Sequence, residues 1–329
     1  MASSALLQRK LKFLKRDFDK LKKGKQGLLV LLDEAEIPEA VYNSNAIENS
    51  TLTLAETEQI LLQAQVARQV SVREVFEAQN LARVTSYLRA SRESLSEELI
   101  LKLHGMLLTG INDSIAGRFR SRGEYVRVGT HLGSAPEHLA RKLENSLDDY
   151  TAELDSYFLD KIAKFHLQFE NLHPFVDGNG RIGRVLLNYQ LQALGFPSII
   201  IRDRDKEEYY RCFAAFDDRG ETKGLEKILA LALQESLHKR LAYLHAAKII
   251  RVTDYARAQG QTTRAALNAA RRQTMPAFRE RGVWKMGILN DEGGILNGGM
   301  AEMVGERLEL GHFNFAALHS VRVEILFIV

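Results

Sequence analysis

The stretch from His173 to Arg184 constrains the fold of this chain more than any other part of its sequence. It reads H-P-F-V-D-G-N-G-R-I-G-R, and its centre is a glycine–asparagine–glycine turn. Gly178, Asn179 and Gly180 can adopt backbone angles that a β-carbon denies to most residues. Successive N–H groups in such a turn form a concave anion site. The apolar pattern that continues to Leu191 predicts a helix, so the turn would lead into a helix N-terminus, where phosphate is favoured.

Two arginines follow the turn. Arg181 and Arg184 are three residues apart and would share one face of the predicted helix. Each guanidinium can offer a fork of donors to phosphate oxygens. With His173 as a proton acceptor and Asp177 as an oxygen donor, the stretch predicts a polyphosphate site beside a general base.

The same stretch resembles the signature of the Fic family, H-x-F-x-[D/E]-G-N-G-R-x-x-R. Every specified position is matched, by His173, Phe175, Asp177, Gly178, Asn179, Gly180, Arg181 and Arg184. Eight fixed positions in one window make a specific signal, although a helix-capping loop with a surface histidine is the alternative. The resemblance implies a protein adenylyltransferase, which moves AMP from ATP to a hydroxyl side chain of a target protein or of itself.

The resemblance also implies a role for each motif residue. His173 would be the general base for the target hydroxyl. Asp177 would bind Mg²⁺, which prefers hard oxygen ligands. Phe175 would be a buried anchor for the loop. The residues expected to hold the nucleotide phosphates are Asp177, Gly178, Asn179, Gly180, Arg181 and Arg184, and catalysis would consist largely of positioning and electrostatics.

An upstream segment, Ser44 to Asn49, fits the family's inhibitory pattern [S/T]-x-x-x-E-[G/N]. Glu48 would pair with Arg184, because one arginine cannot serve a carboxylate and a phosphate in the same geometry. The regulatory residues implied are Ser44, Glu48 and Asn49. A surface helix that happens to carry a glutamate is the other interpretation. Since this motif precedes the catalytic one, the chain resembles the subgroup with an N-terminal inhibitory helix.

Two further segments resemble parts of the Fic fold. Residues 117–120 and 125–131 resemble its hairpin flap, which would hold the target through residues 124–131 by strand addition. The flap residues expected to contact nucleotide are Val128, Gly129, Thr130 and His131. Tyr209 and Tyr210 would flank the adenine or would be core tyrosines of a helix. Asp217 stands where some relatives carry an asparagine, which leaves the nucleotide preference open.

The net charge of +3 is unevenly distributed. Residues 1–25 hold nine Lys and Arg against two acids, and residues 248–285 hold nine against two. The first segment predicts a basic amphipathic helix that lies on the body. The second resembles a helix-turn-helix of the winged or excisionase type, with DNA as a candidate partner and a small helical domain with a solvated basic face as the alternative.

The fold class expected is mainly α: a Fic-type helical bundle with a short β-hairpin flap, plus a small C-terminal winged-helix domain. We expect an N-terminal helical region with the inhibitory motif at 1–110 and a catalytic domain at 111–245. The helix-turn-helix domain would occupy 246–290, with an uncertain tail at 291–329. Capping boxes at 53–56 and 94–97 predict two helix starts.

Composition excludes several classes of protein. The single Cys212 excludes an intramolecular disulfide, predicts a buried thiol and fits a cytoplasmic location. No zinc-type spacing occurs, and no apolar run of about 20 residues predicts a membrane span. The sequence leaves room for a homo-oligomer. Two alternative functions remain: a DNA-binding regulator that uses a Fic body as a nucleotide sensor, and a de-AMPylase or other phosphate-group transferase.

Overall fold

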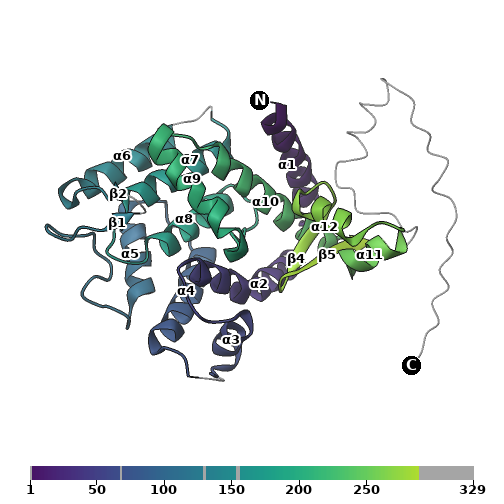
Figure 1. Ribbon diagram of the computed structural model, residues 1–329, viewed down its shortest axis with the longest axis horizontal. Helices are drawn as coiled ribbons and strands as arrows, with labels where there is room; N and C mark the ends of the chain where they lie inside the picture. Colours follow the sequence, from purple (N-terminus) through teal and green to yellow (C-terminus); the bar gives the residue numbers. More distant parts are fainter. Residues whose placement is uncertain (1, 67–68, 129–130, 153–155, 289–329) are drawn as a thin grey trace.

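Helices make up most of the protein, as the sequence predicts (Figure 1). The computed structural model describes residues 2–66, 69–128, 131–152 and 156–288. The helices are α1 (Ala2–Leu21), α2 (Gln26–Ile47), α3 (Leu54–Glu58), α4 (Val72–Ala90), α5 (Glu97–Leu108), α6 (Leu139–Ala152), α7 (Phe158–Leu172), α8 (Asn179–Ala193), α9 (Lys206–Arg219), α10 (Lys223–Leu244), α11 (Val252–Ala258) and α12 (Thr263–Arg271). The strands are β1 (Arg127–Val128), β2 (His131–Leu132), β3 (Lys248–Arg251), β4 (Ala277–Glu280) and β5 (Val283–Ile288). Short helical turns occur at Gln59–Gln63, Pro136–His138 and Asp203–Asp205.

Helix α1 lies along α10, with its apolar stripe against the body. Leu11, Leu14 and Phe18 recur at helical spacing and are all buried. Burying such side chains stabilises the contact by about 1.5–3 kcal/mol each. The prediction of an amphipathic helix lying on the body is therefore confirmed.

The part of the protein that contains the predicted catalytic motif, named here the catalytic body, is built around α7 and α8, which pack against each other. One apolar core joins these two helices to α4 and α5, and includes Leu81, Ile100, Leu103, Phe169 and Ile182. A second core joins the opposite side of α7 and α8 to α9 and α10. The loop between α7 and α8 is thus held by two cores, which fixes the place where the motif lies.

The two predicted capping boxes differ in outcome. Thr53 caps α3, and Glu56 returns a bond to the Thr53 backbone, as predicted. The box predicted at 94–97 is wrong, because α5 begins two residues later. Ser96 is its N-cap and accepts a hydrogen bond from the Leu99 amide. Serine is a favoured N-cap at either position, although only Ser94 has a glutamate three residues later, so the packing of Leu99 and Ile100 into the core decides which serine is used.

The C-terminal domain has a winged-helix architecture. Its three strands are antiparallel in the order β3-β5-β4, and α11 and α12 pack beside them. Val252, Ala266, Ala270 and Met286 form its small core with Trp284. The helix pair and the strand-like end near Trp284 occur where the sequence predicts them, and the helix-turn-helix function stays a prediction. Strand β3 was not predicted, because four residues after a long helix carry little periodicity.

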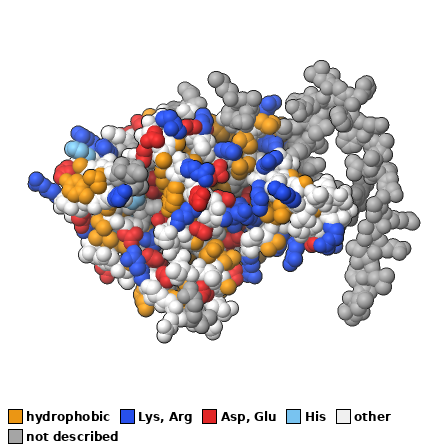
Figure 2. Space-filling view, in the orientation of Figure 1, with side chains coloured by type: hydrophobic (Ala, Val, Ile, Leu, Met, Phe, Trp, Pro, Cys, Tyr) orange, Lys and Arg blue, Asp and Glu red, His pale blue; other side chains and the backbone are white. Residues whose placement is uncertain are grey.

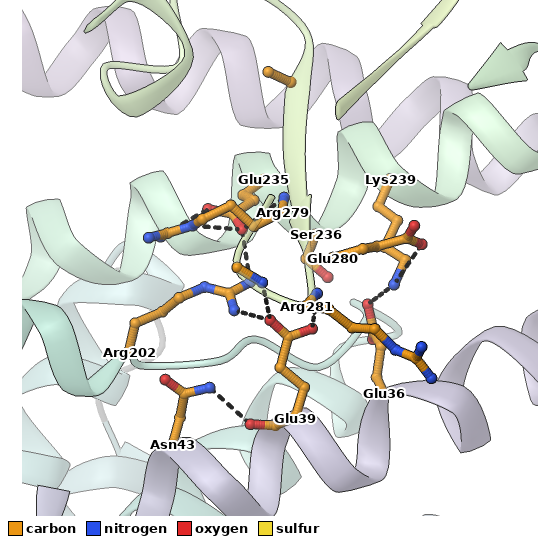
Figure 3. A network of polar contacts seen from close by, with 12 residues as sticks. Glu36, Glu39, Asn43, Arg202, Glu235, Ser236, Lys239, Arg279, Glu280 and Arg281 are labelled. Carbon is orange, nitrogen blue, oxygen red and sulfur yellow. Dashed lines mark hydrogen bonds and ion pairs between the residues drawn. The ribbon is translucent and has the colours of Figure 1, made fainter. Parts of the chain in front are cut away.

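Helix α2 runs between the catalytic body and the C-terminal domain, and it joins them through a polar network (Figure 3). The Glu39 carboxylate pairs with Arg202 of the body and accepts hydrogen bonds from the backbone amides of Arg281 and Gly282. These two residues form the β4–β5 turn, with positive φ at both positions. Such a two-residue turn suits a tight hairpin. The tip of the wing therefore lies against the helix that carries the predicted inhibitory motif.

The remaining sequence predictions concern Cys212, membrane-spanning helices and the C-terminal tail. Cys212 is buried and unpaired, as predicted. Over the ranges described, the model contains no helix with the length and apolarity that a bilayer crossing needs. The tail expected at 291–329 lies outside the described residues.

Candidate active site

The motif forms a loop between two helices, with left-handed backbone angles near each end of it. Helix α7 ends at Leu172, and His173 caps it with φ +50°. Helix α8 begins at Asn179, after Gly178 with φ +83°. A residue other than glycine is uncommon in the left-handed region, so the turn at His173 needs support from its surroundings.

Asn179 and Phe175 hold the loop from inside. The Asn179 side chain accepts a hydrogen bond from the Phe175 amide and donates one to its carbonyl, both at 2.9 Å. The Phe175 ring is fully buried and stacks on His104, with ring centroids 3.7 Å apart. The prediction of Phe175 as an anchor is confirmed. The side chain of Asn179 shapes the loop, so its predicted contact with nucleotide would come from its backbone.

His104 of α5 ties the loop to the opposite helix. Its Nδ1 accepts a hydrogen bond from the Gly117 amide, so Nε2 carries the proton and donates to the Asp177 carbonyl, 3.0 Å away. Burial lowers the pKa of His104 to about 4, and the ring stays neutral. No sequence motif points to His104, because its partners lie 13 and 73 positions away.

Arg120 fastens the start of the flap to the strained turn. Its guanidinium donates to the carbonyls of His173 at 2.8 Å, Glu124 at 2.9 Å and Ser134 at 2.7 Å. Its backbone amide donates to the Pro174 carbonyl. Arg120 is buried, so these carbonyls fix one conformation of the His173 turn.

The His173 ring is oriented by the helix it terminates. Its Nδ1 lies 3.1 Å from the Glu170 carbonyl oxygen. A carbonyl can only accept a hydrogen bond, so Nδ1 carries the proton in the neutral ring. The other nitrogen, Nε2, is then the proton acceptor that a general base requires.

Asp177 lies between two arginines. Arg181 pairs with its Oδ1 at 3.1 Å, Arg73 of α4 pairs with Oδ2, and the Gly178 amide donates to Oδ1 at 2.6 Å. Burial would raise the pKa of this carboxyl, but Arg181 and Arg73 outweigh it and hold the pKa below its usual range. Asp177 is therefore anionic at neutral pH. Arg73 was missed in the sequence because it lies 104 residues before its partner.

The two motif arginines have different neighbours, although they share a helix. Arg181 is buried, and it pairs with Glu77 of α4 at 3.1 Å as well as with Asp177. Arg184 faces α2 instead. Its Nε donates to the Ser44 hydroxyl at 2.9 Å, and its Nη2 donates to the Ser44 carbonyl and to Glu48 Oε1, both at 2.8 Å. The predicted residues Ser44 and Glu48 are thus brought to Arg184 across 140 and 136 positions of sequence.

Gly180 makes this contact sterically feasible. A β-carbon at position 180 would lie 2.3 Å from Glu48 Oε1 and 3.0 Å from Arg184 Nη1. Either the glutamate or the turn would have to move. The glycine that suits an anion-binding turn therefore also admits the carboxylate.

A buried polar cluster lies behind Arg184. The His166 Nε2 and the Tyr209 hydroxyl are 2.6 Å apart, and one oxygen of Glu170 is buried without a hydrogen-bond partner within the described part of the chain. Burial raises the pKa of Glu170 to about 8, with Arg184 opposing and Glu48 reinforcing this shift. Burial lowers the pKa of His166 to about 3. Both groups are neutral at pH 7, so Glu48 is the ionised carboxylate that pairs with Arg184.

The tyrosine pair is divided between the core and the surface. Tyr209 is fully buried against His166, which favours the core interpretation for this residue. Tyr210 is 38% exposed, and its hydroxyl donates to the Ile47 carbonyl beside Glu48. The third regulatory residue, Asn49, accepts a hydrogen bond from Lys206 Nζ at 2.8 Å. Asp217 accepts one from the side chain of Asn171.

The flap is a short antiparallel hairpin in which Val128 pairs with His131 and Arg127 with Leu132. Strands β1 and β2 confirm the predicted hairpin. Gly129 and Thr130 lie outside the described residues. The contacts predicted between these flap residues and the nucleotide remain predictions.

The fold is thus helical, and its loop places a glycine-rich turn at a helix N-terminus beside His173, an anionic carboxylate and two arginines. Residues 94–191 match the family model described as Fic/DOC family. This match includes the whole motif from His173 to Arg184.

Curated relatives include "Protein adenylyltransferase Fic" of Nematostella vectensis, which is 34% identical over 177 residues. That match covers 52% of this chain and 41% of the relative. "Protein adenylyltransferase Fic" of Drosophila willistoni is 29% identical over 202 residues, covering 60% of this chain and 40% of the relative. The chain thus spans about two fifths of the length of these relatives.

Solved structures agree with the fold. Fic-1 of C. elegans, residues 134–508, superposes with a TM-score of 0.62 at 26% identity, covering 73% of this chain and 72% of that one. A Fic family protein of Desulfovibrio desulfuricans superposes with a TM-score of 0.60 at 21% identity. It covers 87% of this chain and 97% of its own length, so its likeness concerns the fold and extends over most of both chains.

Proposed function

We propose that this protein is a protein adenylyltransferase that transfers AMP from ATP to a hydroxyl side chain of a protein. One observation carries the proposal: a single loop places a proton acceptor, an anionic carboxylate and two arginines around the N-terminus of α8. That end of a helix favours phosphate through its unpaired N–H groups and its dipole. The names of the curated relatives support the same activity.

The proposed reaction is an exchange at the α-phosphorus of ATP. The target hydroxyl oxygen forms a bond to that phosphorus, the bond from that phosphorus to the α,β-bridging oxygen breaks, and pyrophosphate leaves. His173 Nε2 takes the hydroxyl proton, since Nδ1 already carries one that it donates to Glu170. The Gly178–Gly180 turn and the arginines hold the phosphates, so the barrier falls mainly through positioning and charge stabilisation.

Asp177 fits a magnesium role. It is anionic and partly accessible, with 32% of its side chain exposed. Among the residues described, no three His, Cys, Asp or Glu side chains form a metal cluster. Asp177 would hold the ion together with phosphate oxygens and water, as is usual for Mg²⁺. When bound, the ion would neutralise charge on the phosphates.

We propose that Glu48 restrains this activity. Its carboxylate occupies the donors of Arg184 that would otherwise meet a phosphate. Burial would lower the pKa of Arg184, but the nearby Glu48 outweighs it and raises the pKa. Arg184 is thus always charged and binds whichever anion reaches it, so nucleotide and Glu48 compete.

The test is incubation with ATP labelled at the α-phosphate, Mg²⁺ and a cell lysate. We expect Glu48→Gly to increase labelling of protein by roughly tenfold or more, because one charge-assisted hydrogen bond is worth about 1.5–3 kcal/mol. The double variant Glu48→Gly/His173→Ala is the blank. Equal labelling by wild type and Glu48→Gly would reject the inhibition. Label retained only from the γ-phosphate would reject AMP transfer in favour of another phosphate-group transfer.

DNA binding by the C-terminal domain is a second candidate, favoured by its winged-helix architecture. Arg257 of α11 and Arg264 of α12 are exposed there. We expect the full chain to bind duplex DNA with an affinity that falls steeply with salt, as phosphate contacts require. Fluorescence anisotropy of a labelled duplex measures this. Absence of binding at low salt would remove the DNA-binding candidate and leave the transferase proposal untouched.

A further inference from the structure

A cavity of about 290 Å³ lies between the catalytic body and the C-terminal domain. Its walls come from the segment before α9, from α10, from the end of α12 and from β4 and β5. None of its lining residues belongs to the loop from His173 to Arg184. Among the residues predicted to hold the nucleotide, the cavity shares Tyr209 alone with the proposed catalytic site.

The cavity wall is rich in cations. Six basic residues line it against three acidic ones, Asp205, Glu208 and Glu235. The six are Arg202, Arg204, Lys227, Arg271, Arg272 and Arg279. In the space-filling view, Lys and Arg side chains gather over the region where α10, α12 and β4 are labelled (Figure 2).

Arg202, Arg279 and Arg204 are paired with acids, Arg204 with Asp205 at 3.7 Å, whereas the other three basic residues form no ion pair within the described residues. Arg279 and Arg202 both bond to Glu235, at 3.1 Å and 2.8 Å, and the close-up shows them converging on it (Figure 3). Lys227 and Arg272 are exposed and form no ion pair within the described ranges, and neither does Arg271, which bonds only to Asn268. The wall thus has three cations without an ion pair in the described chain, and its remaining acid, Glu208, offsets only part of their charge.

Two buried donors in the wall also lack partners. Arg202 Nε and Trp284 Nε1 are buried N–H groups without an acceptor in the described residues, and each whole residue is 7% exposed. A buried donor without an acceptor costs about 1–3 kcal/mol. Burial lowers the pKa of Arg279, and Arg202 adds to this, although Glu235 opposes it. These buried N–H groups in the wall therefore lack hydrogen-bond acceptors, and the basic residues of the wall outnumber its acidic ones.

The remaining wall is apolar. Ile200, Ile228 and Leu231 face the rings of Tyr209 and Trp284 around the cavity. Arg279 lies over the Trp284 ring, 4.7 Å from its centroid. Small-molecule sites combine such apolar walls with a few placed polar groups, and their volumes begin near roughly 300 Å³.

We propose that this cavity binds a small organic anion, with an aromatic or apolar body against Trp284 and an anionic group at Arg271 and Arg272. The apolar wall takes the body, the unpaired cations at the mouth take the charge, and the buried donors supply hydrogen bonds. The site adjoins Arg202, which also holds Glu39 of α2. The proposal does not depend on the transferase activity.

Trp284 is the only tryptophan in the chain, so its fluorescence reports on the cavity directly. The full-length protein is titrated with phenyl phosphate and with benzoate. The compound that binds with the lower Kd shows whether the site prefers a phosphate or a carboxylate group. Two control probes each lack one half of the ligand: benzyl alcohol lacks the anionic group, and inorganic phosphate lacks the aromatic ring. We expect a saturable fluorescence change with an aromatic anion, and at least about tenfold weaker binding by both half-ligands.

The variant Arg271→Ala/Arg272→Ala should raise the Kd by about tenfold or more, since a hydrogen bond to a charged group is worth about 1.5–3 kcal/mol. The matched control is Arg257→Ala/Arg264→Ala, which removes two exposed charges of the same domain outside the cavity. Its Kd should change by less than about twofold. Both double variants alter exposed side chains, and circular dichroism checks that they fold.

Three outcomes would overturn the proposal. The first is no saturable change with either aromatic anion. The second is an equal loss of affinity in the two double variants, which would mean a general charge effect. The third is equal affinity for inorganic phosphate, which would mean an adventitious ion site. Calorimetry with Trp284→Phe gives a second readout, in which loss of the Nε1 donor should weaken binding several-fold.

Discussion

Helix α2 places two glutamates against arginines of the catalytic body, and the two contacts are built differently. Glu39 and Arg202 are both buried, with 9% and 8% of their side chains exposed, and Glu39 uses both oxygens. Glu48 is 36% exposed and bonds Arg184 through one oxygen. A buried pair is costly to separate, whereas a half-exposed carboxylate can exchange its arginine for water. The first contact therefore fixes the helix, and the second can open while the helix stays in place.

This difference suggests how a single helix can serve both as an anchor and as a switch. The wing turn at Arg281 and Gly282 also bonds to Glu39, so the C-terminal domain braces the fixed end of α2. At the end that carries Ser44 and Glu48, Arg184 bonds to both side chains, while Tyr210 and Lys206 bond to the neighbouring Ile47 carbonyl and Asn49 side chain. A nucleotide phosphate needs to displace one side chain there, not a helix.

The largest effect is expected from the buried contact. Glu39→Ala should lower the free energy of unfolding by about 3–5 kcal/mol, because it leaves the buried Arg202 without one of its carboxylates. Urea denaturation measures the loss, with Glu34→Ala, an exposed residue of the same helix, as control. An unchanged urea midpoint of unfolding for Glu39→Ala would show that the Glu39–Arg202 contact does not fix the helix.

The second prediction concerns Glu170, the carboxyl behind Arg184. Its pKa of about 8 lies above the ordinary value, so the unfolded chain loses this proton at lower pH than the folded chain does. Its contribution to stability is therefore complete below about pH 4.5 and falls as pH rises towards 8. Glu170→Gln should be more stable than wild type at pH 7 by an amount on the order of 3 kcal/mol.

The measurement is the difference between the two unfolding free energies from pH 5 to 8. Subtraction removes the contribution of His166, whose lowered pKa gives the opposite slope at acid pH. A difference that stays constant with pH would mean that Glu170 is ionised in the folded protein. It would then be a second anionic partner for Arg184.

The third prediction concerns the half-exposed contact. Glu48→Gly should tighten ATP binding by roughly tenfold, since Arg184 is freed from a competing carboxylate. The same change should alter the free energy of unfolding by less than about 1 kcal/mol, beyond the cost of glycine at the helix end. Isothermal calorimetry with Mg²⁺ and ATP measures the first quantity, and urea denaturation the second. A stability loss as large as that of Glu39→Ala would contradict the comparison.

The smallest effect should come from Ser44→Ala. It removes the hydroxyl that accepts from Arg184 Nε but keeps the Ser44 carbonyl and Glu48 in place. One neutral acceptor is worth about 1 kcal/mol, so ATP should bind up to about fivefold more tightly. Isothermal calorimetry measures the Kd for ATP of Ser44→Ala, and the change is compared with that of Glu48→Gly. An effect equal to that of Glu48→Gly would mean that the serine, not the carboxylate, holds the arginine.

The local features of the site could be predicted from the sequence because each depends on neighbours along the chain. The turn at Gly178, the helix from Asn179 and the spacing of Arg181 and Arg184 follow from short-range geometry. The amphipathic helix at the N-terminus follows from periodicity in the same way. The pairing of Glu48 with Arg184 could be predicted as well, but only through resemblance to a family, since no physical rule links positions 136 residues apart.

The tertiary structure alone decided which side chains surround these local features. Arg73, His104 and Arg120 reach the loop from other elements and leave no periodic or spacing signal in the sequence. The same holds for the neutral state of Glu170, because its pKa depends on burial by helices distant in the chain. A sequence fixes backbone geometry through neighbouring residues, whereas desolvation and long-range pairing exist only once the chain has folded.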